Sequence, residues 1–477
     1  VVGHAAKIMG TPSTTVMHPI RMVGLSAEQL MALNPHYVPQ FFEADEGSVK
    51  IDANGVYPEV NDVLAALLSH SRAVVQQTYP DINAVVLTVP DGSSAPRRSQ
   101  LMGAAAQAGL EVRAMIDQTS AAALAVFDPS QHHVVAVFDF GASHTAMSIV
   151  EVGNHTVDPV ETYHINLGVQ HIIEQVASLA NQLAQRDFGQ RLFDPNHIFA
   201  RQTAELIAAS VVHELSTKET AEFSMTTADG EILVVDIDWK MFETTLRGHL
   251  SELELALTPP VDIDDPHGAS IAQGDEYEKE MKIRRDEQRE QQRRRERLTA
   301  VMCVVGGAHI PLLREFVGRL CQREPIQLEH EPNKIVALGA AVLADALDQQ
   351  TPLTLVQRAT TDFGTWIKRG NGYVMDVLFR RGERIPNERS QRYRVHQPSY
   401  TEEVYQWVGP GYGQWKSKDN PGLITLKTQT VKLKGHRVKC TFGFDQFGIP
   451  FFVVTDPAAP FGRRATRLTS FQVQESM

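Results

Sequence analysis

Strand-like and helix-like patterns of hydrophobic positions alternate along residues 1–345. Residues 82–90, INAVVLTVP, form a continuous apolar run that ends at a proline, which is typical of a strand buried on both faces. An Ala-rich stretch follows and stops at Gly109, as expected for a helix that ends at a glycine. Apolar residues recur at helical spacing in 168–191 and 196–218, where we expect long helices. This alternation predicts an α/β architecture.

The pattern changes near Thr351. Beyond this residue, short runs of strand-forming residues, such as GIPFFVVTD at 448–456, are separated by turn residues. The regular spacing of short strands predicts an antiparallel β-sandwich. We therefore expect an α/β domain over 1–347, a sandwich over 351–457 and a tail over 458–477.

Residues 275–297, DEYEKEMKIRRDEQREQQRRRER, contain almost no apolar side chains. Opposite charges recur there at helical spacing, which favours a solvated single helix inserted into the α/β domain. The Arg-rich end of this segment suits contact with RNA or with an acidic surface of a partner. A solvated arm without a ligand is the alternative, and composition alone favours it.

Composition and charge narrow the classes of protein. Of the 477 residues, 43% are hydrophobic, which is enough to build about two to four structural units. The net charge of −12 argues against nucleic-acid binding by the whole surface. The three cysteines are widely spaced and form no C-x-x-C pair, so they support neither a disulfide framework nor a zinc site and indicate a reducing compartment. No run approaches the roughly 18 apolar residues of a membrane span, so we expect no membrane partner.

Residues 137–152, VFDFGASHTAMSIVEV, predict two buried strands joined by a tight turn at Gly141. A hairpin that holds a nucleotide has this outline, because its backbone N–H groups must approach phosphate oxygens. Here the turn continues with Ala142, Ser143 and His144. Their Cβ atoms restrict the left-handed conformations that such a turn uses. We therefore expect a hairpin of this shape that holds a phosphate poorly.

Taken in order, several segments resemble the seventy-kilodalton heat-shock chaperones. The opening VVGHAAKIMG is similar to the family's G-x-A-A-K segment, and 83–127 is similar to its strand, helix and following motif. The 138–152 hairpin stands where the family has its second phosphate hairpin, and VVGGAHIPLL at 304–313 stands at its adenosine-binding turn. EPNKIVALGAAV at 331–342 is similar to its returning helix, and the β-rich segment resembles its peptide-binding sandwich.

The resemblance implies a fold and a chemistry. The implied fold is an actin-like (ribonuclease H-like) nucleotide domain followed by an antiparallel β-sandwich. The nucleotide domain is expected to be incomplete at the N-terminus, because no counterpart of the family's first phosphate hairpin follows Val1. ATP hydrolysis in this fold needs two Gly-rich hairpins around the phosphates, carboxylates that fix the water shell of Mg²⁺, and a lysine that orients the attacking water.

By this resemblance, Lys7 and Asp139 are the remaining members of the catalytic set. Gln118 and Ala146 replace the family's other carboxylates, and neither side chain can supply charge to a metal's hydration shell. We therefore expect no catalytic residue and no metal site. Lys7 is then expected to form a surface ion pair, Asp139 to cap a strand end, and His144 to be a hydrogen-bonded turn residue rather than a metal ligand.

The same resemblance implies that adenine is bound less well than in the family. Val212 and His213 stand where the family has the Lys and Arg that sandwich the base. We expect no cofactor, and ATP or ADP held without turnover is the alternative. The glycines expected to contact a nucleotide, if one binds at all, are Gly141, Gly306, Gly307 and Gly339.

These losses predict a catalytically degenerate, chaperone-like pseudo-ATPase that acts as a non-hydrolysing scaffold or co-chaperone subunit. The connection ADALDQQTPLTL at 344–355 is short, and we expect no helical lid after the sandwich. The architecture is most similar to the lidless subunit of the ribosome-associated complex, which pairs with a zuotin-type co-chaperone. We expect protein partners in a stable ribosome-associated, axonemal or organellar assembly, and therefore a cytoplasmic, flagellar or organellar protein. An active ATP-dependent chaperone, with its first phosphate loop upstream of Val1, is the alternative.

Overall fold

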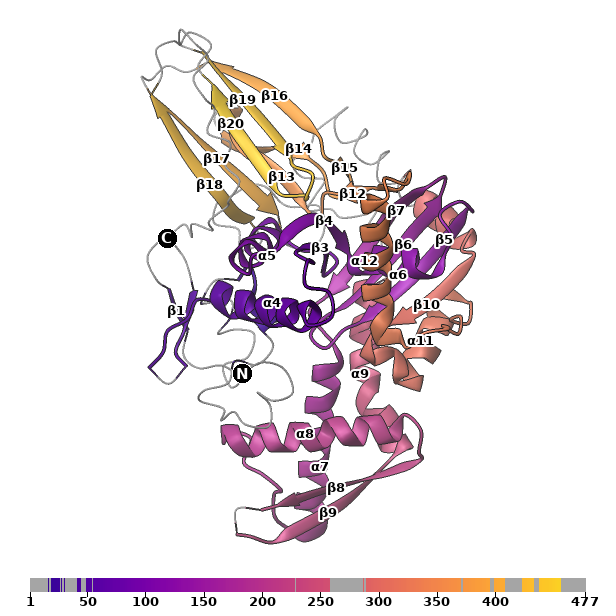
Figure 1. The fold of residues 1–477 in the computed structure, drawn as a ribbon. Helices are drawn as coiled ribbons and strands as arrows, with labels where there is room; N and C mark the ends of the chain where they lie inside the picture. The colour runs from indigo at the N-terminus through magenta and orange to yellow at the C-terminus, as the bar shows by residue number, and fades with distance from the viewer. Residues whose placement is uncertain are drawn as a thin grey trace. The chain divides into compact units, whose positions relative to one another are not determined.

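The computed structural model describes the chain as two units (Figure 1). The first consists of Val1–Met115, Asp262–Asp286 and Leu355–Met477, and the second of Ile116–Val261 and Glu287–Thr354. The two units group the predicted sandwich with the residues before 116. The domain boundary predicted from the sequence near 347–351 stays a prediction. The described residues are 16, 19–25, 27, 30, 41–43, 49–53, 55–227, 229–257, 286, 289–369, 372–394, 399–407, 423–432 and 437–455.

A five-stranded sheet forms the centre of the second unit. Its order is β10-β5-β6-β7-β11. Strand β10 runs parallel to β5, whereas β5–β6 and β6–β7 are antiparallel pairs. Every residue of β5 after His133 is buried, as predicted for the first strand of the 137–152 hairpin. The run at 82–90 forms β3 (Ala84–Val89), but only its last residue is buried, so the prediction of a strand buried on both faces was wrong there. The strands are β5 (His133–Phe140), β6 (Thr145–Gly153), β7 (Thr156–Ile165), β10 (Ala300–Val304) and β11 (Thr354–Leu355).

Two helices pack against each other beside this sheet. Helix α6 (Gln118–Val126) packs on α12 (Pro332–Asp348), which begins with a proline at its first turn. A Cβ built at Gly339 of α12 would lie 1.7 Å from the carbonyl oxygen of Ala121 on α6. The two helix backbones can approach this closely only because position 339 has no side chain.

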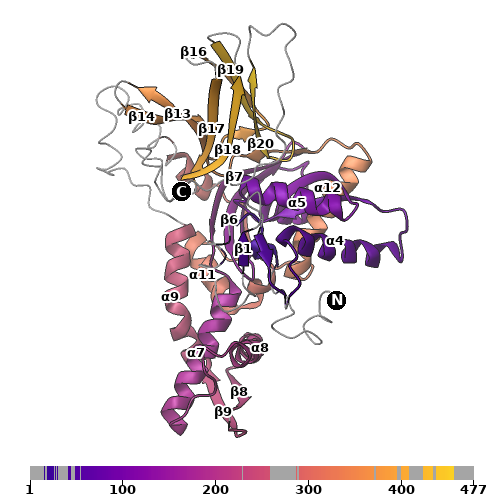
Figure 2. The ribbon, with the colours of Figure 1, turned by 90° about the vertical axis from the view of Figure 1, so that its left-hand side faces the viewer.

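Three longer helices and a ribbon extend from the sheet in the second unit (Figure 2). Their apolar faces join β5 and β6 in one continuous hydrophobic core. The ribbon has strictly alternating burial in both strands, and Gly230 in its Asp-Gly turn has φ of +81°. These elements are α7 (Val169–Phe188), α8 (Ile198–Leu215), β8 (Thr220–Thr226), β9 (Ile232–Asp238) and α9 (Trp239–Leu257). The turn η2 (Gly306–His309) and α11 (Pro311–Cys321) follow β10.

The N-terminal part of the first unit contains short strands and two main helices. Strands β3 and β4 form a two-stranded sheet, as do β1 and β2. A hydrophobic cluster joins α2 and α4 to β2. The elements are α2 (Pro19–Met22), β1 (Phe41–Glu43), β2 (Val49–Ile51), α4 (Val60–Gln76), β3 (Ala84–Val89), α5 (Ala95–Gln107) and β4 (Glu111–Asp117).

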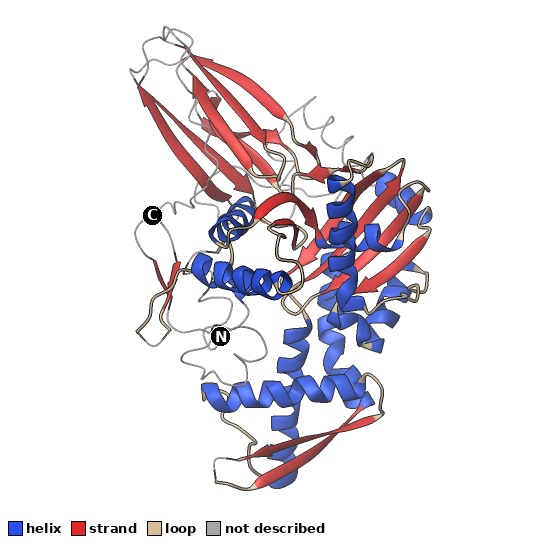
Figure 3. Ribbon diagram, viewed as in Figure 1, coloured by secondary structure: helices blue, strands red, loops and turns tan. Residues whose placement is uncertain are grey.

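The C-terminal part of the same unit is built from strands (Figure 3). One sheet has the order β14-β13-β17-β18 and the other β16-β19-β20, and every pairing whose register is known is antiparallel. A core in which five phenylalanines pack with aliphatic side chains fills the space between them. The strands are β12 (Gln357–Arg358), β13 (Asp362–Arg369), β14 (Gly372–Phe379), β15 (Arg384–Ile385), β16 (Glu388–Arg394), β17 (Ser399–Trp407), β18 (Leu423–Lys432), β19 (Arg437–Phe444) and β20 (Pro450–Thr455).

Polar contacts connect these strands to α5 and β4. The buried guanidinium of Arg98 donates from Nη1 to the carbonyl oxygen of Phe447 at 3.3 Å. Nε2 of Gln357 donates to the carbonyl oxygens of Met115 and Gln446 at 3.3 and 3.1 Å. The β19–β20 turn is therefore held by side chains from distant parts of the sequence.

The charged segment differs from the expectation of a wholly solvated helix. Residues 289–296 are helical, but Arg294 points inward and pairs with Glu161 of β7, Nη1 to Oε1 at 3.4 Å. The prediction was wrong at this end because a buried carboxylate in the sheet needs a counter-ion. Most of 275–288 lies outside the described residues. Among the described helices, none has the length and apolar character needed to cross a bilayer.

The packing of α6 on α12 can be tested at Gly339. We expect Gly339→Ala to destabilise the protein by about 2–4 kcal/mol, because the new Cβ would overlap the backbone of Ala121. Gly248 in α9 is the matched control, since a Cβ there meets no atom within 4 Å. Gly248→Ala should be neutral or stabilise the helix by up to about 1 kcal/mol. Urea unfolding measures both, and equal midpoints for the two variants would contradict the tight packing.

Candidate functional site

The turn between β5 and β6 is the centre of the candidate site. In this antiparallel pair, Asp139 lies opposite Ala146 and Phe140 opposite Thr145. Directly opposed residues place their side chains on the same face of a sheet. The cross-strand neighbour of the Asp139 carboxylate is therefore a methyl group. Asp139 is 1% exposed and Ala146 is fully buried, so neither presents an open face to solvent.

The hairpin turn is clamped to the start of α7. The backbone N–H of Val169 donates to the carbonyl oxygen of Gly141 at 3.0 Å, and that of Gln170 donates to Ala142 at 2.8 Å. Oγ1 of Thr145 donates to the carbonyl oxygen of Leu167 at 2.7 Å. The first N–H groups of a helix are the ones that commonly bind an anion. Here the turn itself uses two of them.

Two close approaches shape this turn. A Cβ at Gly168 would lie 2.6 Å from the carbonyl oxygen of Gly141 and 2.7 Å from the carbonyl group of Ala142, so only glycine fits between the helix start and the turn. Within the turn, the imidazole of His144 folds back over Gly141, and its Nδ1 would lie 3.5 Å from a Cβ built there. The histidine therefore occupies space beside the glycine that remains from the family's Gly-rich run.

The Gly-Gly turn adjoins the hairpin. Val304 pairs with Asp139 in the parallel ladder, so the turn that follows β10 lies at the end of β5. Val305 has φ of +67° and ψ of −176°, a strained conformation for a β-branched residue. A Cβ at Gly307 would lie 2.5 Å from Cβ of Phe140, whereas a Cβ at Gly306 would meet nothing within 4 Å. Of these two glycines, only Gly306 borders open space.

The other predicted nucleotide contacts have different surroundings. Gln118 is the first residue of α6, and its buried Oε1 has no hydrogen-bond partner among the described residues. Gly339 is pressed against α6, so its missing side chain serves helix packing. Val212 is buried in the core and His213 is exposed, so the two do not form facing walls for a base. Lys7 lies outside the described residues.

These residues fit a hydrated Mg²⁺ poorly. Such an ion is held through carboxylates, and the described part of this site offers Asp139, with an amide at 118 and a methyl group at 146. Within the described ranges, no group of three or more His, Cys, Asp or Glu side chains has a metal-binding arrangement. The hairpin, the Gly-Gly turn and Gln118 all belong to the second unit.

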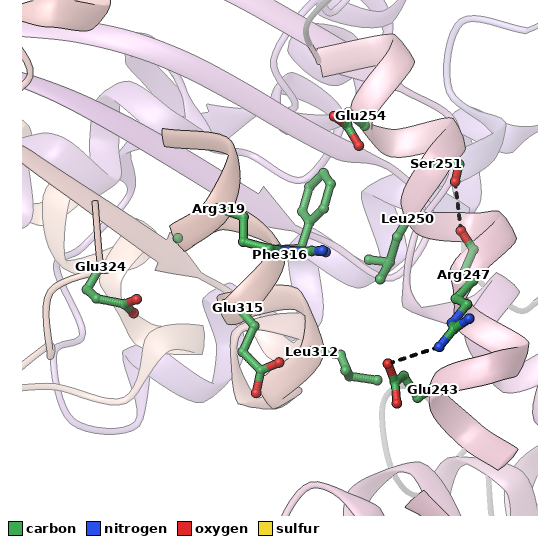
Figure 4. A pocket seen from close by; sticks show the side chains of 11 residues that line it. Glu243, Arg247, Leu250, Ser251, Glu254, Leu312, Glu315, Phe316, Arg319 and Glu324 are labelled. Carbon is green, nitrogen blue, oxygen red and sulfur yellow. Dashed lines mark hydrogen bonds and ion pairs between the residues drawn. The ribbon is translucent and has the colours of Figure 1, made fainter. Parts of the chain in front are cut away.

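A groove elsewhere in the second unit contains none of these residues. It lies between α9 and α11, has a volume of about 700 Å³, and is lined mainly by charged side chains over Leu250, Leu312 and Phe316 (Figure 4). Within α9, Arg247 forms an ion pair with Glu243, Nη2 to Oε1 at 3.6 Å. None of the residues that line this groove is among those predicted to bind a nucleotide.

A buried polar cluster near the start of α7 escaped the sequence analysis. Glu205 of α8 is 6% exposed, and its two carboxylate oxygens accept from Gln170 at 3.0 Å and Arg201 at 2.9 Å. Burial raises the pKa of Glu205 to about 7, and the Arg201 ion pair opposes this shift. Burial also lowers the pKa of His249 to about 4. The sequence feature that could have revealed this cluster is Glu205 itself, an acidic residue within the apolar stripe of a predicted helix.

The pH dependence of stability tests Glu205. Its folded-state pKa lies above the ordinary value of 4.5, so the native protein binds more protons between pH about 4.5 and 7. Stability from this group is therefore fully present below pH 4.5 and is lost as the pH rises through about 7. We expect the free-energy difference between the wild type and Glu205→Gln to shift by about 1–3 kcal/mol across this range.

His249 contributes equally to both proteins in that comparison, and its own effect has the opposite sign. Because its pKa is lowered from 6.5, its stabilisation is lost as the pH falls below that value. Urea unfolding of both proteins at several pH values gives the difference directly. A difference that does not change with pH would show that the Arg201 ion pair offsets the burial of Glu205.

The comparisons with known proteins cover most of the chain. The Hsp70 protein family model matches residues 1–255. The HscA homolog chaperone of Actinobacillus pleuropneumoniae is 25% identical over 399 residues, which are 82% of this chain and 57% of that protein. HscA of Yersinia enterocolitica is 25% identical over 391 residues, 80% of this chain and 56% of that protein. HscA of Proteus mirabilis is 24% identical over 399 residues, 82% of this chain and 58% of that protein. The chain thus spans less than two thirds of the length of these relatives.

Proposed function

Because the chain belongs to the Hsp70 protein family, we propose that it is a member that has lost ATP hydrolysis and acts as a scaffold or co-chaperone subunit of a larger assembly. The family match confirms the predicted fold, an actin-like nucleotide domain of mixed α/β structure with antiparallel strands after it. Its relatives are named as chaperones. The loss of activity and the scaffold role are our proposal.

One observation carries this proposal. Ala146 stands directly opposite Asp139 in the hairpin, so the position where the resembled family has a second carboxylate holds a buried methyl group. Phosphoryl transfer depends on charge placed around the phosphates and their metal ion. With Gln118 neutral as well, the described side of the site has a single carboxylate for that purpose. A metal-bound triphosphate would be held too weakly to be cleaved.

The clamped turn supports a structural role for the hairpin. Two backbone hydrogen bonds join the turn to the first residues of α7, and the Thr145 hydroxyl donates to the carbonyl oxygen of Leu167 just before that helix. A protein whose hairpin is held in this way presents one conformation to its partners. Nucleotide-driven switching, in contrast, needs a ligand that binds two conformations with different affinity.

The proposed partner is a zuotin-type co-chaperone, in a ribosome-associated assembly of the cytoplasm. Axonemal or organellar assemblies are the other settings that we propose for the same role. The basis is the short 344–355 connection and the sandwich that follows it. Partner binding is directly measurable by affinity purification of the endogenous protein.

An ATP-dependent chaperone is the second candidate, and a nucleotide held without turnover is intermediate. The open space beside Gly306 and the strained backbone of Val305 favour some ligand at that turn. The HscA relatives are named as chaperones, which also favours this candidate. It requires Gln118 and Ala146 to be tolerated by the chemistry.

Steady-state phosphate release by the full-length protein separates these functions. We expect a rate at least about 100-fold below that of an active family member assayed in parallel, because several charge-stabilising groups are replaced. Turnover at the active rate, abolished by Lys7→Ala, would refute the proposal.

The double variant Gln118→Glu, Ala146→Asp provides the complementary measurement. Restoring both carboxylates should increase the Mg²⁺ dependence of nucleotide binding, measured by fluorescence of a labelled ATP. The control is Gly248→Ala, which lies on an exposed face of α9 away from this turn. Nucleotide retained by the purified wild type, without phosphate release, would favour the intermediate function.

A further inference from the structure

The end of the charged insertion is an arginine-rich helix whose orientation is fixed. Residues 289–297 contain five arginines, two glutamates and no lysine, a net charge of +3 in a chain of net charge −12. Residues 289–296 are helical, and the segment leads directly into β10 of the central sheet. The favourable end of a helix for cations is its C-terminus, where most of these arginines stand.

Arg294 attaches this helix to the sheet. Its guanidinium lies 3.4 Å from Oε1 of Glu161 on β7 and 4.0 Å from Oε1 of Glu151 on β6. It also pairs with Glu290 one turn earlier, at 3.6 Å. The Glu161 side chain is 4% exposed, and burial raises its pKa while Arg294 opposes the shift. A buried carboxylate without this partner would be costly, so Arg294 is held in place.

A face of the helix next to Arg294 presents arginines to solvent. Residues four apart share a helix face, so Arg289, Arg293 and Arg297 form one row. The Arg293 side chain is 66% exposed, and its pairing with Glu290 at 3.8 Å is a weak surface ion pair. Arg297 is also exposed. Like charges at this spacing disfavour an isolated helix, so the attachment through Arg294 is what holds the row in order.

We propose that this row binds the phosphate backbone of a nucleic acid. Guanidinium groups form planar, bidentate hydrogen bonds with phosphate oxygens, and the complete preference for Arg over Lys in this segment fits that geometry. Phosphate contacts need only charge and hydrogen-bond donors. An acidic protein partner fits less well, because residues 289–297 contain no apolar side chain for the core of a protein interface.

The net negative charge of the chain limits nucleic-acid binding to the surface that carries the arginine row. The surrounding negative charge repels polyanions, so affinity depends on the few arginines of the row and on the salt concentration. We expect a dissociation constant of about 10⁻⁴–10⁻⁶ M, the range of sequence-independent binding. This property is independent of ATP hydrolysis, and therefore of the function proposed above.

Fluorescence anisotropy of a labelled RNA duplex, titrated with the full chain at about 50 and about 200 mM salt, tests the proposal. Arg293→Gln, Arg297→Gln should weaken binding about tenfold or more at the lower salt concentration and reduce the slope of log affinity against log salt by about 2. The matched control is Arg186→Gln, Arg247→Gln, which removes the same charge from two exposed arginines on other helices. The control should bind like the wild type.

A DNA duplex of the same sequence identifies the source of the phosphate. Equal binding of both duplexes indicates the backbone alone, and a preference for RNA adds the 2′-hydroxyl or the A-form shape. Failure of the wild type to bind either duplex at about 1 mM protein in the lower salt would overturn the proposal. Equal losses in the row variant and the control would overturn it too. Displacement of RNA by a polyglutamate peptide of equal charge would reassign the row to an acidic protein.

Discussion

The approach of the β5–β6 turn to the first residues of α7 is the contact on which the arrangement of the site depends. Gly168 permits it, because any side chain there would overlap the carbonyl groups of Gly141 and Ala142. The same turn carries Phe140 against Gly307, so the hairpin, α7 and the Gly-Gly turn meet at one point. Backbone hydrogen bonds within the chain then satisfy the donors of the helix start. Hydrogen bonds between backbone groups therefore hold the turn against the start of α7.

Two buried glutamates in the second unit are each paired with an arginine. Glu205 and Glu161 are both carboxylates buried in a mainly apolar setting, and each is neutralised by one arginine, Arg201 and Arg294 respectively. Burial of an acid is costly unless such a partner is present. At Glu205 the pair joins α7 to α8 through Gln170. At Glu161 it determines the direction of the arginine-rich helix, which links the stability of the sheet to a charged surface outside it.

Sequence periodicity was a sound guide to local structure. The first strand of the predicted 137–152 hairpin is buried, and the two long helical patterns became α7 and α8. The run at 82–90 also forms a strand, β3, but most of its residues are only half-buried. The antiparallel strands after Thr351 were also predicted correctly. In each case a few neighbouring residues decide the outcome, because strand and helix burial depends on spacing along a short segment.

The sequence by itself determined the kinds of element, the fold class through its resemblance, and which side chains stand at positions 118, 139 and 146. The tertiary structure alone decided that Gly339 meets Ala121, that Arg294 reaches Glu161, and that Glu205 is buried with Arg201. The first two contacts join residues far apart in the chain, and the third depends on which helix face turns inward. Spacing along a sequence carries little information on such approaches, since they follow from how several elements fill one core.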